Sequence, residues 1–163
     1  TVESHALVAH TLLGLGCRPG APQPEFTPIV SFMQTLLKAK CIAIPGSTAC
    51  IYLTAELFPK LGIADKIVVK LTPRGTDSTS LVAIGSADLA IQAVSELLNG
   101  EGVDFVGTVP AEAQFVEVFS AAIVAGSKQQ EDSKRLIAFL ASENAHAAIK
   151  NSGLEPKSKT DRK

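Results

Sequence analysis

Residues 41–50 read CIAIPGSTAC, a short apolar run that breaks into proline, glycine and two hydroxyl residues before a helix-like stretch. Length and composition predict a short buried strand at 41–44, and helical spacing predicts a helix at 48–61. The apolar positions of this helix are Ile51, Leu53, Leu57 and Phe58. A strand that passes through a Gly/Ser/Thr loop into a helix is typical of an α/β sheet.

The same alternation of strands and helices extends along the rest of the chain. Further strands are predicted at 6–17, 67–71, 88–93, 103–109 and 114–126, where apolar runs end at Gly, Pro or charged residues. Further helices are predicted at 28–39, 77–84 and 94–98, and after Ser127 and Ser142. We therefore expect an α/β fold with helices packed on a sheet.

Several helix ends carry capping or stop signals. Thr27 is predicted to cap helix 28–39, with Pro28 at its first position. Ser127 and Gln130 have the spacing of a capping box. Pro59 is expected to kink or end helix 48–61. The predicted core face of the helix after Ser127 consists of Leu136, Ile137, Phe139 and Leu140.

Composition excludes several classes of protein. Apolar residues make up 46% of the 163 residues and charged ones 19%, which is enough for a core and argues against disorder. The 15 basic and 16 acidic residues give a net charge of −1, with no basic stripe for nucleic acid. No apolar stretch has membrane-spanning length. The chain begins at Thr1, consistent with a trimmed N-terminus, and no signal peptide is visible.

Cysteines and histidines predict neither a metal site nor a cofactor. The three cysteines, Cys17, Cys41 and Cys50, have no metal-like spacing and are expected to be small buried apolar residues. A Cys41–Cys50 disulfide would bridge a strand and a helix start, where the geometry is unfavourable. The histidines, His5, His10 and His146, are scattered and have no nearby partner ligands.

The loop that contains Gly46, Ser47 and Thr48 is the first candidate binding site. The leading N–H groups of a helix lack intrahelical partners, and the helix dipole adds partial positive charge there. Gly46 allows close approach, and the two hydroxyls add donors for an oxyanion. The alternative is that Ser47 or Thr48 only caps the helix.

Two further candidates lie after later strands. In the loop before helix 77–84, Gly75, Thr76 and Ser78 can donate to an anion and Arg74 can neutralise it. Asp77 argues against direct anion contact and is more simply a cap. Gln92, at the end of strand 88–93, is a candidate because open α/β sheets bind ligands at strand carboxyl ends. Its alternative role is that of a surface polar residue.

Six stretches together resemble a known family. They are RPGAPQPE (18–25), LGIADKI (61–67), AIQAVSELL (90–98), VDFVGTVPAEAQ (103–114), VFSAAIVAGSK (118–128) and LIAFLASENAHAAIKNSGLEP (136–156). In order and spacing they are similar to extracellular substrate-binding proteins of bacterial ABC transporters, in the molybdate-binding-protein-like group. The resemblance implies a type 2 periplasmic-binding-protein fold and a periplasmic or extracellular location. It also places the Gly46–Thr48 and Gly75–Ser78 helix starts, and Gln92, facing a ligand.

The resemblance also implies how the chain is divided. A crossover strand and connector would occupy 1–27, the ligand-binding lobe 28–126, the C-terminal helices 127–156 and a loose tail 157–163. Most of the first lobe's opening strands have no counterpart, and the loop after strand 41–44 is shorter than is typical of the group. Exposed sheet edges left by absent strands favour a homodimer.

Three functions follow as expectations. The first is a non-catalytic solute-binding protein of an ABC transport system that works with a permease and holds a small oxyanion or carboxylate through helix N-termini. The second is an isomerase of a small acid such as aconitate, with Glu96, Asp77 or a histidine as the base. The third is a degenerate ligand-sensing or interaction domain.

Overall fold

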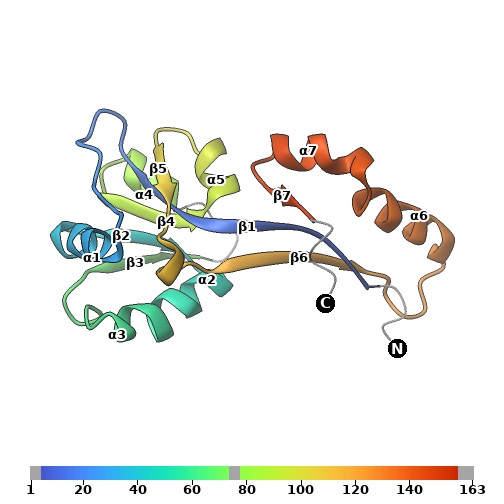
Figure 1. The fold of residues 1–163 in the computed structure, drawn as a ribbon, viewed down its shortest axis with the longest axis horizontal. Coiled ribbons are helices and arrows are strands. Elements are labelled where there is room, and N and C mark those ends of the chain that lie inside the picture. Colours follow the sequence, from blue (N-terminus) through green and yellow to red (C-terminus); the bar gives the residue numbers. More distant parts are fainter. Residues whose placement is uncertain (1–4, 74–77, 158–163) are drawn as a thin grey trace. The chain divides into compact units, whose positions relative to one another are not determined.

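The structure, a computed structural model, describes residues 5–73 and 78–157 (Figure 1). The chain forms two compact units: a larger unit, Leu12–Val116, and a smaller unit that joins Thr1–Thr11 to Glu117–Lys163. The strands are β1 (His5–Cys17), β2 (Ile42–Pro45), β3 (Val69–Thr72), β4 (Leu89–Ala93), β5 (Asp104–Thr108), β6 (Val116–Ala122) and β7 (Glu155–Pro156). The α-helices are α1 (Ile29–Lys38), α2 (Thr48–Ile51), α3 (Phe58–Lys60), α4 (Thr79–Ala83), α5 (Val94–Asn99), α6 (Gln130–Leu140) and α7 (His146–Asn151).

The larger unit is built on a sheet with strand order β3-β2-β4-β1-β5. β2 runs parallel to both β3 and β4, whereas β1 runs antiparallel to β4 and β5. The carboxyl ends of β3, β2 and β4 therefore meet at one edge of the sheet. This mixed α/β architecture is the predicted fold class. The larger unit, Leu12–Val116, contains part of the connector predicted at 1–27 and most of the ligand-binding lobe predicted at 28–126.

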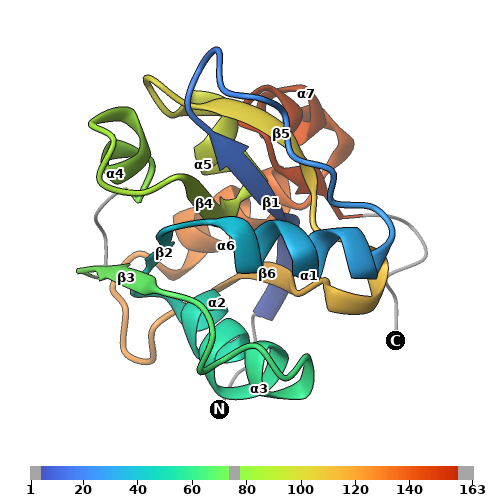
Figure 2. The ribbon, with the colours of Figure 1, turned by 90° about the vertical axis from the view of Figure 1, so that its left-hand side faces the viewer.

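Helices cover both faces of this sheet (Figures 1 and 2). Because side chains alternate along a strand, β2 sends Ile42 and Ile44 to one face and Ala43 to the other. On the first face the strands pack against α1 and the α2–α3 segment, through residues that include Phe32, Leu36, Leu53 and Phe58. On the second face the strand side chains are small, and α4 and α5 pack on them through Val82 and Leu97.

The predicted helix at 48–61 is irregular in its middle. Between α2 and α3, Tyr52–Leu57 forms a π-helical segment, and the backbone amide of Phe58 donates to the carbonyl of Leu53, five residues earlier. The wider turn precedes Pro59, which has no N–H and crowds the carbonyl four residues before it. The irregularity expected at the proline is therefore found on its N-terminal side.

Close packing of β1 against α5 requires glycine at position 16. A Cβ atom built on Gly16 lies 2.7 Å from Val103 Cγ1 and 2.8 Å from Leu97 Cδ2. We expect Gly16→Ala to lower the free energy of unfolding by about 1–3 kcal/mol through overpacking. Urea unfolding followed by circular dichroism measures this loss, and adding Leu97→Val should recover part of it. An unchanged midpoint for Gly16→Ala contradicts the packing described here.

The smaller unit has little core. The N-terminal half of β1 pairs with β6 and with β7, where Ala9 lies opposite Pro156 and His10 opposite Glu155. Its cluster of buried side chains among the described residues consists of Ala9, Ala145 and Ile149, flanked by Val8 and Leu154. This is a small apolar nucleus compared with that of the larger unit.

Helix α6 departs from the prediction in its burial. It forms where expected, but none of its residues is buried, and Leu136 and Phe139 are 58% and 52% exposed. The apolar stripe was predicted from spacing, and no described layer packs on it. The predicted caps also differ. Pro28 rather than Thr27 is the N-cap of α1, and Gln129 rather than Ser127 is the N-cap of α6, with Ser127 Oγ accepting from the Gln129 amide at 3.2 Å.

Candidate functional site

Two candidate segments, and the strand that precedes the third, end at one edge of the larger unit's sheet. Gly46–Thr48 follows β2, the connection before Ser78 follows β3, and Gln92 lies near the end of β4. These are the carboxyl ends of adjacent parallel strands, the usual ligand edge of an open α/β sheet. Arg74, Gly75, Thr76 and Asp77 lie outside the described residues. Their predicted roles stay predictions.

At the first segment, two backbone amides are already used within the protein. The Gly46 amide donates to the Thr72 carbonyl at 2.9 Å, and the Ser47 amide donates to the Pro45 carbonyl at 2.8 Å. Ser47 is the N-cap of α2 but its side chain makes no capping hydrogen bond, so the simple capping role is not observed for it. Ser47 is half-buried and Thr48 is exposed. Two of the amides predicted to face an anion therefore already have acceptors within the protein.

A chain of hydrogen bonds links the start of α4 to the end of β4 and to α5. Both the backbone amide and the hydroxyl of Ser78 donate to Gln92 Oε1, the amide at 3.2 Å, and Gln92 Nε2 donates to Glu96 Oε2. Ser78 is fully buried and Gln92 is 1% exposed, whereas Glu96 lies at the surface in the first turn of α5. We call these three residues the Ser78–Gln92–Glu96 cluster.

The burial of this cluster rules out one of the two roles that the sequence offered for Gln92. Gln92 is not a surface polar residue, because a neutral amide buried this deeply holds its place through its hydrogen bonds. Its burial favours a supporting role, in which it fixes the start of α4 and the carboxylate of Glu96. Sequence reasoning missed this pairing because Ser78 and Gln92 are 14 residues apart and meet only in the folded sheet.

A cavity of about 510 Å³ lies at the opposite edge of the same sheet. The connector after β1, the side of α1 and the residues before β4 line it, and they include Cys17, Arg18, Thr35, Lys38 and Asp88. Sequence reasoning did not single it out, although the proline-rich connector at 19–24 was a visible feature. The cavity is thus separate from the strand ends that the sequence marked.

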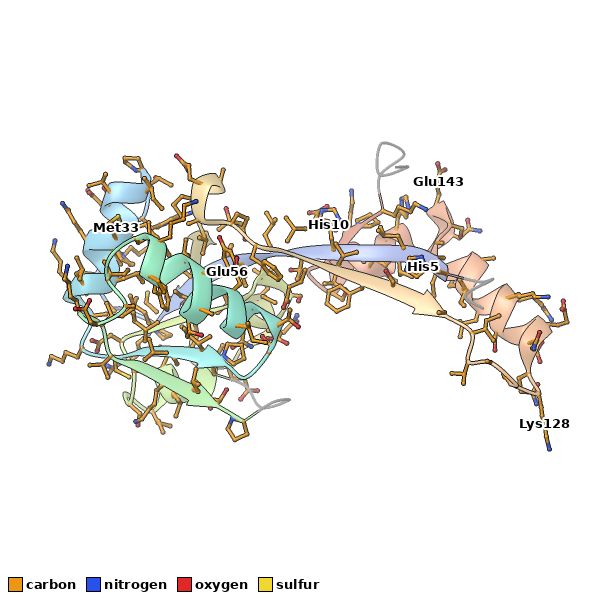
Figure 3. The ribbon with its side chains drawn as sticks, turned by 90° about the horizontal axis from the view of Figure 1, so that it is seen from below. His5, His10, Met33, Glu56, Lys128 and Glu143 are labelled. Carbon is orange, nitrogen blue, oxygen red and sulfur yellow. The ribbon has the colours of Figure 1, made fainter. Side chains whose placement is uncertain are left out.

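The surroundings of Cys17 favour the protonated form of its thiol. Burial raises the pKa of the Cys17 thiol, and the negative charge of Asp104 raises it further, so its reactive thiolate is disfavoured at neutral pH. His5 and His10 lie at separate points along β1 (Figure 3). No three His, Cys, Asp or Glu side chains gather as metal ligands in residues 5–73 and 78–157.

The chain belongs to the bacterial extracellular solute-binding protein family, whose model matches residues 1–155. It is 34% identical over 155 residues to an aconitate isomerase from Pseudomonas sp.. That match covers 94% of this chain but only 59% of the relative. In the described residues, no helix is long and apolar enough to cross a membrane.

Solved structures agree on the type 2 periplasmic-binding-protein fold. The periplasmic molybdate-binding protein of Azotobacter vinelandii aligns with a TM-score of 0.68 over 97% of this chain and 70% of its own, at 16% identity. PEB3 bound to L-phospholactate aligns with a TM-score of 0.71 over 95% of this chain and 69% of its own, at 15% identity. The resemblance read from the sequence is confirmed, for both family and fold.

Proposed function

We propose that this chain binds a small polycarboxylate of the aconitate type and supports its isomerisation. The observation that carries this proposal is the 34% identity to an aconitate isomerase over nearly the whole chain. Of the functions considered from sequence, this match favours the small-acid isomerase over the non-catalytic transport protein. The chain spans 59% of that relative, so binding is the part of the activity to test first.

The ligand edge offers the chemistry that such a reaction needs. The hydroxyl groups of Ser47 and Thr48 can donate hydrogen bonds to a substrate carboxylate, which carries the negative charge. Moving a double bond within such an acid requires a base that removes a proton from a carbon atom and an acid that returns one to another carbon. Glu96 is the described carboxylate at this edge, and Gln92 Nε2 holds one of its oxygens. Gln92 acts in this scheme as a positioning residue.

Ligand-dependent thermal unfolding tests the binding step. Trans-aconitate at about 100 times its dissociation constant should add about 2.7 kcal/mol to the stability of the native state. For a domain of this size that raises the unfolding midpoint by roughly 5–10 °C. Citrate, molybdate and sulfate serve as competitors in the same assay. Ser47→Ala should shrink the rise, and Ser86→Ala, at an exposed serine in the same unit, should leave it unchanged.

Proton NMR of trans-aconitate in heavy water then separates catalysis from binding. An isomerase exchanges a carbon-bound proton of the substrate for deuterium and yields the cis isomer, and Glu96→Gln should abolish both while binding persists. A raised midpoint without exchange supports the second candidate. No midpoint shift with any of the four anions contradicts both and leaves the sensing or interaction domain.

The second candidate is the non-catalytic transport role. The family description and the molybdate-binding structural relative favour it. In this scheme the protein works outside the cytoplasmic membrane, closes on an oxyanion by a hinge motion and delivers it to an ABC permease. A midpoint rise with molybdate or sulfate that exceeds the rise with trans-aconitate is its distinguishing result.

A further inference from the structure

We propose that the cavity between α1 and the connector after β1 binds a small zwitterion with an apolar body, of which an α-amino acid with an apolar side chain is the simplest case. The inference does not involve the strand ends used in the proposed function, since every residue that lines this cavity lies between Cys17 and Leu89 in the larger unit. The cavity volume of about 510 Å³ falls in the range of about 300–1,000 Å³ that small-molecule sites occupy. The walls and charges of the cavity indicate its ligand.

The floor of the cavity is apolar and one of its walls is polar. Cys17 and Leu89 form the floor, where they lie opposite each other in the β1–β4 pair and are 3% and 6% exposed. One side of α1 forms the polar wall, because its lining residues are spaced three and four positions apart. They are Ser31, Gln34, Thr35 and Lys38. A ligand between floor and wall therefore needs an apolar body and polar groups.

The connector closes the other side of the cavity. It runs from the end of β1 to the start of α1 (Figure 2) and lines the cavity with Ala21, Pro22 and Pro24. The proline rings fix the backbone φ angle, and the Thr35 hydroxyl donates to the carbonyl of Glu25, which ties the connector to α1. Because this wall is ordered in advance, ligand binding costs less conformational entropy.

Charged residues of both signs line the cavity. They are Arg18, Glu25, Lys38 and Asp88, two of each sign. Arg18 and Asp88 each adjoin the last paired residues of β1 and β4, so the two are neighbours across this end of the sheet. A Cβ atom built on Gly85 would lie 3.5 Å from Arg18 Nη1, which places the guanidinium beside the turn that leads into Asp88. A cation and a carboxylate thus lie together at one end of the cavity.

The end of α1 brings a second cation to the same place. The Lys40 amide donates to Asp88 Oδ2 at 2.6 Å, and Lys38, two residues earlier, lines the cavity. Within residues 5–73 and 78–157 no ion pair engages Arg18 or Lys38. Both side chains can therefore donate to a ligand carboxylate, and the Asp88 carboxylate has acceptor capacity left for an ammonium group.

A zwitterion matches this arrangement better than an anion does. The carboxylate and ammonium groups of an α-amino acid are attached to one carbon atom, so they can meet neighbouring charges of opposite sign. Its apolar side chain would lie over Cys17 and Leu89, out of water. The equal numbers of acidic and basic residues give no net attraction for a polyanion such as trans-aconitate.

Titration of isotope-labelled protein with L-phenylalanine, followed by amide NMR, tests the proposal. The signals of Cys17, Arg18, Thr35 and Lys38 should shift in a saturable way, with a dissociation constant of about 1 mM or below for a ligand of this size. 3-Phenylpropanoate lacks the ammonium group and 2-phenylethylamine lacks the carboxylate, so each should bind at least tenfold more weakly. The absence of a saturable shift up to about 10 mM, or equally tight binding of either analogue, overturns the proposal.

Asp88→Asn gives an independent measurement. Asparagine keeps an oxygen for the Lys40 amide but loses the charge, so this variant should bind L-phenylalanine at least tenfold more weakly and 3-phenylpropanoate no more weakly than the parent. The matched control is Asp65→Asn, at an exposed aspartate of the same unit, which should change neither affinity. Circular dichroism verifies that both variants are folded.

Two further results would also contradict the site. One is an equal loss of L-phenylalanine affinity in the Asp88→Asn and Asp65→Asn variants. The other is a set of L-phenylalanine shifts confined to Ser47 and Thr48, since the ligand would then bind at the strand ends. Neither result bears on the binding of trans-aconitate, which is titrated separately.

Discussion

Phe32→Ala should lower the free energy of unfolding by about 3–5 kcal/mol, the largest change expected from one substitution in this chain. Phe32 is fully buried on α1 and packs in the cluster that joins α1 and the α2–α3 segment to the sheet. The loss combines the transfer of the ring to water with the cavity that the protein cannot fill. Urea unfolding of the larger unit, followed by far-ultraviolet circular dichroism, measures it.

The matched control is Phe139→Ala in α6. The same atoms are removed, but Phe139 is half exposed, so the expected loss is less than about 1 kcal/mol. Equal losses for the two variants contradict the burial described here. If only the Phe139 variant were destabilised, the smaller unit would hold the main core.

Gln92→Leu should have the second largest effect, on stability and on proton exchange together. Leucine removes the acceptor for both the amide and the hydroxyl of Ser78, which are fully buried. Leaving two buried donors without a partner should lower the free energy of unfolding by about 2–4 kcal/mol. The same variant releases the carboxylate of Glu96 and should slow the proton exchange of trans-aconitate at least tenfold, while trans-aconitate binding persists.

Two variants control this result. Gln34→Leu makes the same change at an exposed position on α1 and should alter stability by less than about 0.5 kcal/mol. Gln92→Glu keeps an acceptor for Ser78 but places a second carboxylate beside Glu96, so it should restore part of the stability and none of the isomerase activity. A Gln92→Leu variant as stable as the parent shows that Ser78 is satisfied in another way.

The sequence predicted the elements of the larger unit well because their signals are local. The helix predicted at 28–39 and the strand predicted at 6–17 agree with α1 and β1 to within one residue at each end. The resemblance to solute-binding proteins rested on many short stretches in a fixed order, and that order survives in the family match over residues 1–155.

The candidate site was predicted only in outline. Strand ends mark the candidate ligand edge, because parallel strands bring their carboxyl ends together. The acceptor that each donor finds is not determined by the neighbouring sequence. The Gly46 amide is taken by Thr72, and Ser78 is taken by Gln92, through contacts that depend on strand register and on residues far apart in the chain.

Burial was the least predictable quantity. The spacing of Leu136 and Phe139 predicts a buried face, but both side chains are more than half exposed, because burial also requires a layer to pack against. A helix pattern carries no information about whether that layer exists in the same chain. For the same reason the cavity beside Arg18 and Lys38 had no sequence signature, since a connector, a helix and a strand start form it together.

The most direct test of the central claim is a titration of isotope-labelled protein with trans-aconitate, followed by amide NMR. The account predicts that the signals of Ser47, Thr48 and the Gln92 side-chain amide shift in a saturable way, while those of Arg18, Thr35 and Lys38 at the opposite edge stay in place. Saturable shifts confined to the cavity residues, with the strand-end signals unmoved, contradict it.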